Sequence, residues 1–251
     1  MTKLVEIMRD DDAGWIWRVT MRRADKRNAL NVEMCQLLNG ALEQCVENGA
    51  RVIVIAAEGP VFSAGADLNE PDFAGHLYPE LEKLFTHIQR LAVPVISYVE
   101  GPAIGAGMLL AMACDLRVAG QRQEVYFSLP VAKMAIGVDA VSIRTLEQLV
   151  GGSRARQMLL GAAPMDVSQA HECGFIVDKR GDEALAELAR TVAQLAPLTL
   201  RNVKMEFAHA CARPFSTAER GKAREAAWNS ADRGEVTTAK LERRGPIFRG
   251  R

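Results

Sequence analysis

The spacing of apolar side chains predicts the elements at the start of the chain. Residues 3–9 and 15–21 alternate between apolar and polar side chains, which is typical of β-strands, and the segment 10–14 between them is rich in Asp and ends in Gly. These segments predict a hairpin. Asn31 is a good helix N-cap, and the residues after it predict a helix. The apolar stripe of this helix consists of Met34, Leu37, Leu38, Ala41, Leu42 and Cys45.

Two continuous apolar runs predict strands that are buried on both faces. Residues 51–57 and 93–99 are short, rich in Val and Ile, and bounded by Gly or Pro. A turn of small residues follows each run, Ser63–Asp67 after the first and Gly101–Gly107 after the second. Behind the second turn, Met108–Ala113 contains helix-forming residues and no polar face, which predicts a buried helix.

The rest of the chain continues this mixture of strands and helices, so the fold class is α/β. After a less regular stretch over 70–79, the apolar residues within 79–90 lie on one stripe of a helix. Further on, the pattern predicts short strands over 116–119 and 125–127, helices over 140–150 and 153–160, and a helix that ends at Gly174. From about Asp182 the pattern is helical throughout, with breaks at Pro197 and Pro214.

Composition and charge limit the classes of function. The 251 residues can bury a substantial core, and 49% apolar with 25% charged residues is ordinary for a soluble globular protein. Because 31 basic residues balance 31 acidic ones, nucleic acid and acidic membranes are not expected as partners. Glu100 and the prolines and glycines around it argue against a membrane span in the apolar region 93–114.

The five cysteines are an odd number and lack metal-ligand spacing, so neither a structural metal nor a disulfide scaffold is expected. The N-terminus lacks the charged-then-apolar pattern of a signal peptide. Together these features predict a cytoplasmic protein.

The glycine turn before Met108 allows two interpretations. Free backbone N–H groups at the start of the helix favour a phosphate, a carboxylate or an oxyanion that forms during a reaction. The turn lacks the lysine of a P-loop, and Glu124 comes too early for a dinucleotide fold. Taken alone, the turn is also typical of a close-packed corner between a strand and a helix.

Several motifs in a fixed order extend this picture over nearly the whole chain. The two central motifs are Phe62-Ser-Ala-Gly-Ala-Asp-Leu68 and Gly101-Pro-Ala-Ile-Gly-Ala-Gly107. They are accompanied by Arg22-Arg-Ala-Asp-Lys-Arg-Asn-Ala-Leu-Asn31, Val93-Pro-Val-Ile96, Ala111-Met-Ala-Cys-Asp115, Gly174-Phe-Ile-Val177 and Glu242-Arg-Arg-Gly-Pro-Ile-Phe-Arg-Gly250. This set resembles the crotonase (enoyl-CoA hydratase/isomerase) superfamily. The resemblance implies a ββα spiral core over residues 1–195 and a C-terminal helical region over 196–251 that builds a homotrimer or a dimer of trimers.

The resemblance also implies a site for a coenzyme A (CoA) thioester. One backbone N–H from each glycine turn, at Ala66 and Ala106, would form an oxyanion hole for the thioester carbonyl. The two positions that match the glutamates of the hydratases hold Leu109 and Val131. Because Leu and Val cannot transfer protons, and each lost group costs roughly 10²–10⁴-fold in rate, efficient hydration is not expected.

Further residues follow from the same resemblance. CoA contacts are expected from Arg27, Ala29, Ala64 and Leu68, and from the tail residues Arg243, Arg244 and Phe248, which would reach the nucleotide of a neighbouring subunit. The lining of the acyl pocket is expected from Leu109, Val131, Leu77, Leu81, Phe85 and Met134. No separate cofactor is expected, because CoA enters as part of the ligand.

Asp139 has two interpretations. It matches the nucleophilic aspartate of chlorobenzoyl-CoA dehalogenase in the same superfamily, but Val131 and Glu82 replace the aromatic and histidine partners of that enzyme. Asp139 also precedes the pattern of a helix, which makes it a good N-cap, and this interpretation is favoured.

The function predicted from the sequence is fatty acyl-CoA or enoyl-CoA binding without efficient hydration, as the resemblance to an actinobacterial subgroup that lacks both glutamates implies. The alternative is an active crotonase enzyme that uses Asp139 or a base not yet located.

Overall fold

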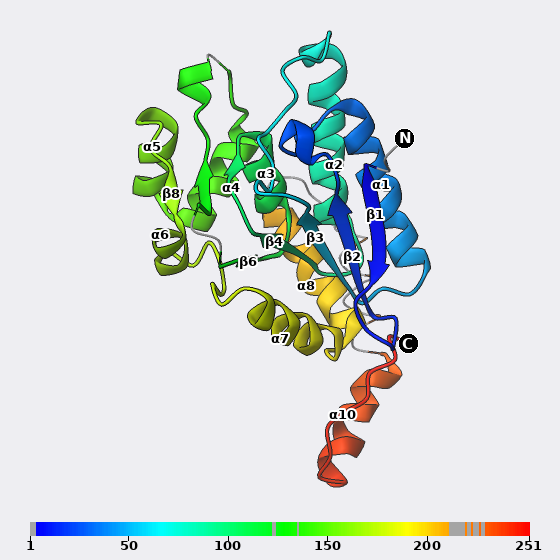
Figure 1. Ribbon diagram of the computed structural model, residues 1–251. Coiled ribbons are helices and arrows are strands. Elements are labelled where there is room, and N and C mark those ends of the chain that lie inside the picture. The colour runs from blue at the N-terminus through cyan, green and yellow to red at the C-terminus, as the bar shows by residue number, and fades with distance from the viewer. Residues whose placement is uncertain are drawn as a thin grey trace.

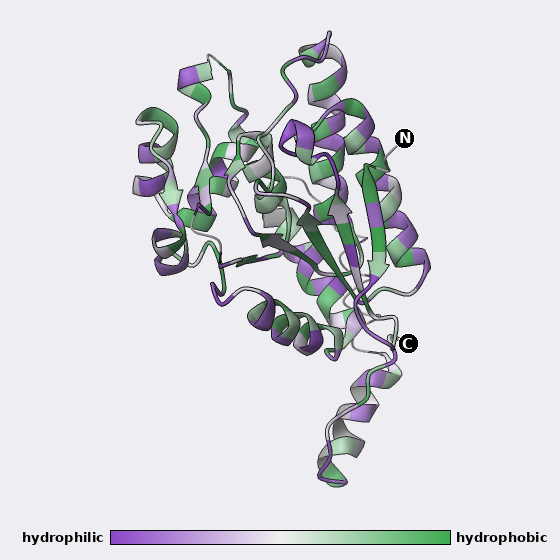
Figure 2. Ribbon diagram, viewed as in Figure 1, coloured by the Kyte–Doolittle hydropathy of each residue, from purple (hydrophilic) through white to green (hydrophobic). Residues whose placement is uncertain are grey.

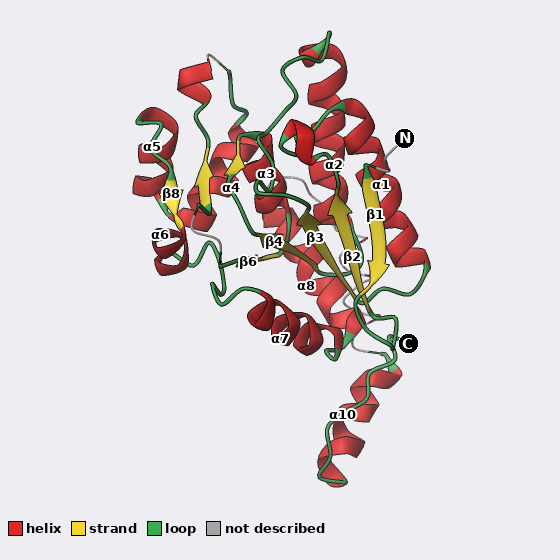
Figure 3. Cartoon of the chain, viewed as in Figure 1, coloured by secondary structure: helices red, strands yellow, loops and turns green. Residues whose placement is uncertain are grey.

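The computed structural model describes residues 4–121, 124–134, 136–210, 219, 222, 226 and 229–251. Its centre is a five-stranded sheet in the order β1-β2-β3-β4-β6 (Figures 1 and 3). The strands are β1 (Val5–Arg9), β2 (Ile16–Met21), β3 (Val52–Ala57), β4 (Val95–Val99) and β6 (Leu116–Ala119). The predicted hairpin is the antiparallel pair β1–β2, and the other neighbours are parallel.

The continuous apolar runs are explained by burial on both faces of this sheet. On β3, Ile53 and Ile55 face one core, while Val52 and Val54 face another. The first core is closed by α1 (Val32–Glu47), α2 (Tyr78–Arg90) and α3 (Ala106–Ala113), and the second by α7 (Asp182–Ala193). Figure 2 shows that the central strands are largely apolar, whereas the helices around them mix apolar and hydrophilic residues.

A second, small sheet lies beside the first. It contains β5 (Ala103–Ile104), β7 (Tyr126–Ser128) and β8 (Met165–Asp166), in the order β5-β7-β8. The remaining elements are η1 (Ala24–Lys26), the π-helix η2 (Phe73–Leu77), η3 (Val131–Met134), α4 (Ala140–Val150), α5 (Gly152–Leu160), α6 (Val167–Glu172), α8 (Pro197–Ala210) and α10 (Ala231–Leu241). Figure 1 shows α10 projecting away from the body formed by the other elements.

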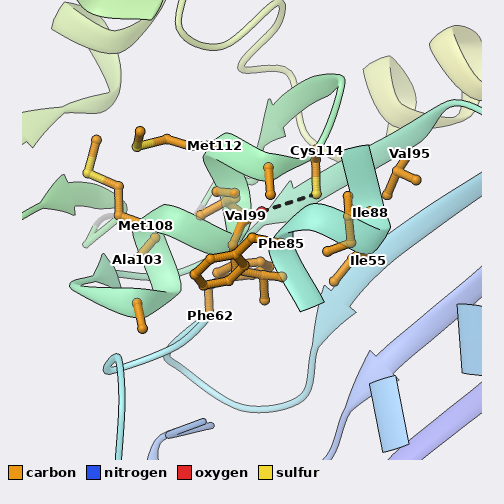
Figure 4. Close-up of a cluster of buried hydrophobic side chains, with 14 of the residues drawn as sticks. Ile55, Phe62, Phe85, Ile88, Val95, Val99, Ala103, Met108, Met112 and Cys114 are labelled. Atoms are coloured by element: carbon orange, nitrogen blue, oxygen red, sulfur yellow. Dashed lines mark hydrogen bonds between the residues drawn. The ribbon is translucent and has the colours of Figure 1, made fainter. Parts of the chain in front are cut away.

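The helix α3 is buried almost completely, as its lack of a polar face predicts. Figure 4 shows Met108 and Met112 of this helix, and Cys114 just after it, among side chains of the surrounding elements. Those neighbours include Phe62, Phe85, Ile88 and Val99. The helix is therefore packed against the main core, and this packing holds its N-terminus, where the glycine turn lies, in place.

Most predicted elements are present, with three corrections. Asn31 caps α1 as predicted, because its side chain accepts a hydrogen bond from the N–H of Met34 at 3.0 Å. Leu37, however, is 41% exposed, so the buried stripe of α1 is narrower than the apolar pattern. The stretch 70–79 is not simply irregular, since it contains η2, and the last residues, 242–251, are not helical. The predicted break at Pro214 lies outside the described residues.

Candidate functional site

The two glycine turns lie side by side and are joined by backbone hydrogen bonds. Ser63 pairs with Ala103 in a parallel bridge: the Ser63 N–H donates to the Pro102 carbonyl at 3.2 Å, and the Ile104 N–H donates to the Ser63 carbonyl at 2.9 Å. The Gly105 N–H donates to the Ser128 carbonyl at the end of β7, at 2.8 Å. Both turns are therefore fixed to strands of the small sheet and to each other.

Glycine is required where the turns touch. Gly65 has a φ of +104°, and a Cβ added there would stand 2.9 Å from the Ile104 carbonyl oxygen and 3.4 Å from the Ala106 nitrogen. A Cβ on Gly107 would stand 2.6 Å from the Ser63 carbonyl oxygen. Since such distances are too short for a methyl group, any larger residue would push the turns apart.

This close approach leaves two backbone donors without a partner. Leu30 pairs with Gly65 and Asp67 on either side of Ala66, at 2.8 Å each, so the N–H of Ala66 itself points away from Leu30. The Ala106 N–H is the first of α3, where no carbonyl of the preceding turn can accept it. Within the described part of the chain, neither N–H has an acceptor. Two adjacent donors, one of them at a helix N-terminus, favour an oxygen that carries negative charge.

The residues predicted to contact CoA fall into two groups. Arg27, Ala29, Ala64 and Leu68 lie on the loops that hold the Ala66 turn: the Ala64 N–H donates to the Arg27 carbonyl at 2.9 Å, and Arg27 and Leu68 are exposed. Arg243, Arg244 and Phe248 lie in the tail after α10.

The tail is bound to its own helix and to the body. Arg244 forms ion pairs with Glu235 and Glu242, and the Phe248 carbonyl accepts a hydrogen bond from Arg51 at 2.7 Å. The structure does not bring the tail residues to the glycine turns of the same chain.

The predicted acyl pocket is nearly closed. Beside α3 lies a cavity of about 20 Å³, which accommodates one water molecule. Its lining is Phe85, Gln89, Leu109, Met112, Ala113, Val141, Ser142 and Thr145. Of the six predicted lining residues, Leu109 and Phe85 border this cavity.

The other four predicted lining residues lie elsewhere. Leu77 and Leu81 are buried in the main core. Val131 is half-buried and begins η3, and Met134 on the same element is exposed. Among the described residues, no side chain that lines the cavity carries a carboxylate.

Asp139 caps α4. Its carboxylate accepts hydrogen bonds from the N–H of Ser142 at 2.9 Å, from the Ser142 hydroxyl at 2.7 Å and from the Tyr78 hydroxyl at 3.3 Å. Burial raises the pKa of Asp139, but these hydrogen bonds, together with one from the Val141 backbone, outweigh it and lower the pKa below its ordinary value. The carboxylate is therefore held ionised, and its oxygens are occupied by the cap.

The sequence pattern missed two buried cations at the C-terminal end of α3. Arg117 is 4% exposed and donates to the backbone carbonyls of Phe175, Cys114, Ala111 and Asp115, the closest being Phe175 at 2.6 Å. Lys204 on α8 donates to Asp115 at 2.6 Å and to the Val93 carbonyl at 2.8 Å. A charged residue inside the otherwise apolar strand 116–119 was the available signal for Arg117.

Comparisons with known proteins define the class of this chain. The chain belongs to the enoyl-CoA hydratase/isomerase family, whose model matches residues 12–251. It is 35% identical over 233 residues to the probable enoyl-CoA hydratase echA6 of Mycobacterium tuberculosis, covering 92% of this chain and 95% of the relative. It is 32% identical over 243 residues to the 2,3-dehydroadipyl-CoA hydratase of Escherichia coli, covering 93% and 94%.

Solved structures agree in fold. A putative enoyl-CoA hydratase/isomerase family protein from Hyphomonas neptunium superposes with a TM-score of 0.86 at 25% identity, over 100% of this chain and 99% of that chain. An enoyl-CoA hydratase/carnithine racemase from Magnetospirillum magneticum gives 0.85 at 25% identity, over 100% and 97%. The predicted superfamily and the α/β fold are thereby confirmed.

None of the helices in the described segments is both long and apolar enough to cross a membrane. Among the described residues, no three His, Cys, Asp or Glu side chains lie close enough together to hold a metal ion.

Proposed function

We propose that this protein binds fatty acyl-CoA or enoyl-CoA thioesters and does not hydrate them efficiently. The observation that supports this most directly is the pair of adjacent N–H groups at Ala66 and Ala106, neither of which has an acceptor within the described residues. A thioester carbonyl oxygen placed between them accepts both hydrogen bonds. When the carbonyl becomes enolate-like, these bonds strengthen because the oxygen gains charge.

The chemistry that follows binding is limited by the neighbouring side chains. Hydration needs one group that removes a proton from water and one that protonates the enolate carbon. Leu109 and Val131 occupy the two positions that hold glutamate in the hydratases, and the cavity beside Leu109 has no carboxylate. In this proposal the amide pair binds and polarises the thioester, and neither Leu109 nor Val131 can transfer a proton.

The acyl chain has to displace side chains in order to enter. A cavity of about 20 Å³ holds one water molecule, which is far less than an acyl chain. In this proposal the acyl chain of the ligand enters beside Leu109 and displaces η3, in which Met134 is 46% exposed. CoA itself lies along the loops of Arg27, Ala64 and Leu68.

The remaining parts of the proposal concern the whole protein. Residues 1–195 form the CoA-binding core, and residues 196–251 assemble a homotrimer or a dimer of trimers in which Arg243, Arg244 and Phe248 approach a neighbour's nucleotide. The projecting position of α10 supports this assignment. Identities of 35% and 36% to mycobacterial relatives support membership of the actinobacterial subgroup. The proposal also includes a cytoplasmic location and no separate cofactor.

The test combines binding and turnover on pure protein. Calorimetry with acetyl-, octanoyl- and palmitoyl-CoA should show affinity that rises with chain length, by at most ~0.8 kcal/mol for each buried methylene. Hydration of crotonyl-CoA and longer enoyl-CoA should stay near background. Gly65→Ala, which fills the space beside the Ala106 nitrogen, should weaken thioester binding. Equal affinity for acetyl- and palmitoyl-CoA would contradict the apolar pocket.

The relatives are named as hydratases, and this favours one alternative. In it the protein is an active crotonase enzyme, either a hydratase or an isomerase, that uses Asp139 or a base not yet located. Turnover of any enoyl-CoA at ~1–10³ per second, the usual range of enzymes, would establish this alternative.

A further inference from the structure

One ion pair links the loop after β2 to the turn that presents the Ala66 N–H. A guanidinium nitrogen of Arg23 (Nη1) donates to Asp67 Oδ2 at 2.7 Å and to the Ala29 carbonyl at 2.9 Å. Both side chains are largely buried, with 16% and 11% exposed. Asp67 directly follows Ala66, and its own N–H donates to the Leu30 carbonyl at 2.8 Å. One guanidinium thus bridges the two segments that pair around Ala66.

Arg23 is itself held on a rigid base. Its N–H donates to the Asn28 side chain at 2.9 Å, and its carbonyl accepts the Asn28 N–H at 2.9 Å. Asn28 is completely buried, and its side-chain amide donates to the carbonyls of Glu58 and Val61. The backbone of Arg23 is therefore held, through Asn28, against the segment that leads into the Ser63–Asp67 turn.

The other oxygen of Asp67 shapes the turn after Ala66. Asp67 Oδ1 accepts hydrogen bonds from the backbone and side-chain nitrogens of Asn69, at 3.1 Å each. Burial raises the pKa of Asp67, but the bonds from Arg23 and Asn69 outweigh it and keep the pKa below its ordinary value. The Asp67 carboxylate therefore stays ionised, with Oδ2 bound by Arg23 and Oδ1 bound by Asn69.

A pair of this kind contributes more to geometry than to stability. Desolvation offsets most of the Coulomb attraction of a largely buried pair, so its net stabilisation is small. The relative orientation of the two side chains, however, is fixed by charge-assisted hydrogen bonds. Asp67 directly follows Ala66, and Gly65 before it lies against the start of α3, so we expect a shift of Asp67 to change the direction of the Ala66 N–H.

We propose that Arg23 is a positioning residue that, through Asp67 and the Ala29 carbonyl, aims the Ala66 N–H at the carbonyl oxygen of a bound thioester. This inference rests on the proposed function and deepens it, because it assigns the protein's preference for a thioester carbonyl to one ion pair. Arg23 touches no ligand in this arrangement. Its effect appears only in contacts to the carbonyl oxygen.

The experiment compares two ligands that differ in that carbonyl alone. Calorimetry is performed with decanoyl-CoA and with the S-decyl thioether of CoA. The wild type should prefer the thioester about tenfold, which corresponds to ~1.4 kcal/mol from the two hydrogen bonds. Arg23→Met should lower this preference to about twofold, while affinity for the thioether changes little.

Three further variants separate positioning from general stability. Arg22→Met removes the neighbouring exposed ion pair with Glu58, which measures 2.6 Å, and should retain the full preference. Arg23→Lys, whose ammonium can donate to both acceptors, should restore part of the preference. If Arg23→Met does not fold, Asp67→Asn replaces it, because asparagine keeps an oxygen for Asn69 and loses the charge that Arg23 binds. It should reduce the preference to a similar extent.

The outcomes are distinct. A preference that stays tenfold in Arg23→Met or Asp67→Asn overturns the positioning role, even if the variant is less stable. A wild type that binds both ligands equally instead refutes the amide pair as a carbonyl site, and with it the proposed function. A preference lost equally in Arg22→Met would show that any disturbance of the loop has this effect, and would also overturn the role of Arg23.

Discussion

At the scale of single residues, the candidate site is defined by two backbone N–H groups, those of Ala66 and Ala106, that have no acceptor among the described residues. Gly65 and Gly107 allow the two turns that carry Ala66 and Ala106 to lie in close contact. Such donors need no functional side chain, so the chemistry of the site is set by the side chains next to them. In the proposed function, the apolar side chains of Leu109 and Val131 account for binding without hydration.

The role of Asp139 can be tested at this scale. Its carboxylate caps α4, so Asp139→Ala should lose ~1 kcal/mol of unfolding free energy, while Asp139→Asn should lose little because asparagine caps about as well. Urea unfolding measures both. Neither change should alter acyl-CoA affinity by more than a few-fold. If Asp139→Asn abolishes turnover of a CoA thioester while fold and affinity are preserved, Asp139 is catalytic and the cap is only its second role.

The pH dependence of the same variants has a definite sign. Hydrogen bonds lower the pKa of Asp139 in the folded state, so the ionised carboxylate stabilises the protein above the ordinary aspartate pKa near 4. This contribution is lost as the pH falls through the lowered value. The stability advantage of the wild type over Asp139→Ala should therefore shrink under acidic conditions and stay constant near neutral pH.

At the scale of elements, the helix α3 depends on contacts along its whole length. Its N-terminal turn presses on Ser63, its side chains are buried in the main core, and its last carbonyls accept hydrogen bonds from Arg117. The N-terminus that provides the Ala106 N–H is therefore positioned by the packing of the entire helix.

Gly107→Ala tests the closest of these contacts. An alanine normally stabilises a helix by ~1 kcal/mol relative to glycine. At position 107 the added methyl group would stand 2.6 Å from the Ser63 carbonyl oxygen, and such overpacking costs ~1–3 kcal/mol. We expect the clash to dominate, so that urea unfolding shows a less stable protein. The matched control is Gly40→Ala in α1, where no atom lies within 4 Å of the added group and the change should be stabilising. Equal stabilisation by both substitutions would show that α3 does not press on the turn.

Elements and turns were more predictable from the sequence than long-range partners. The period-two segments, the caps and the two glycine turns are local patterns, and Asn31 and Asp139 cap their helices as predicted. The partners of Arg117 are backbone carbonyls, one of them at Phe175, and no local pattern identifies them. Leu37 fits the apolar stripe of α1 but is exposed, and spacing alone does not show which part of a stripe the rest of the protein covers.

At the scale of the whole molecule, an ion pair between the buried Lys204 and the partly buried Asp115 connects α8 to the core. Lys204 of α8 is 5% exposed, and its Nζ donates to Asp115 directly after α3 and to the Val93 carbonyl before β4. Asp115 also accepts the Val95 N–H at 2.7 Å. A single side chain thus joins the region assigned to oligomerisation to the strand and helix that form the glycine turn.

Lys204→Met should loosen this connection. Removing one partner of a buried pair leaves the other charge uncompensated and costs ~3 kcal/mol. Unfolding free energy should fall by about this amount, and hydrogen exchange should accelerate in α8 more than in α3, because the helix loses its bond to the core while α3 keeps Arg117. Asp115→Asn combined with Lys204→Met should recover part of the loss, since no unpaired charge then remains, and the double-mutant cycle measures the coupling. If exchange in α8 is unchanged in Lys204→Met, this ion pair does not hold α8 to the core.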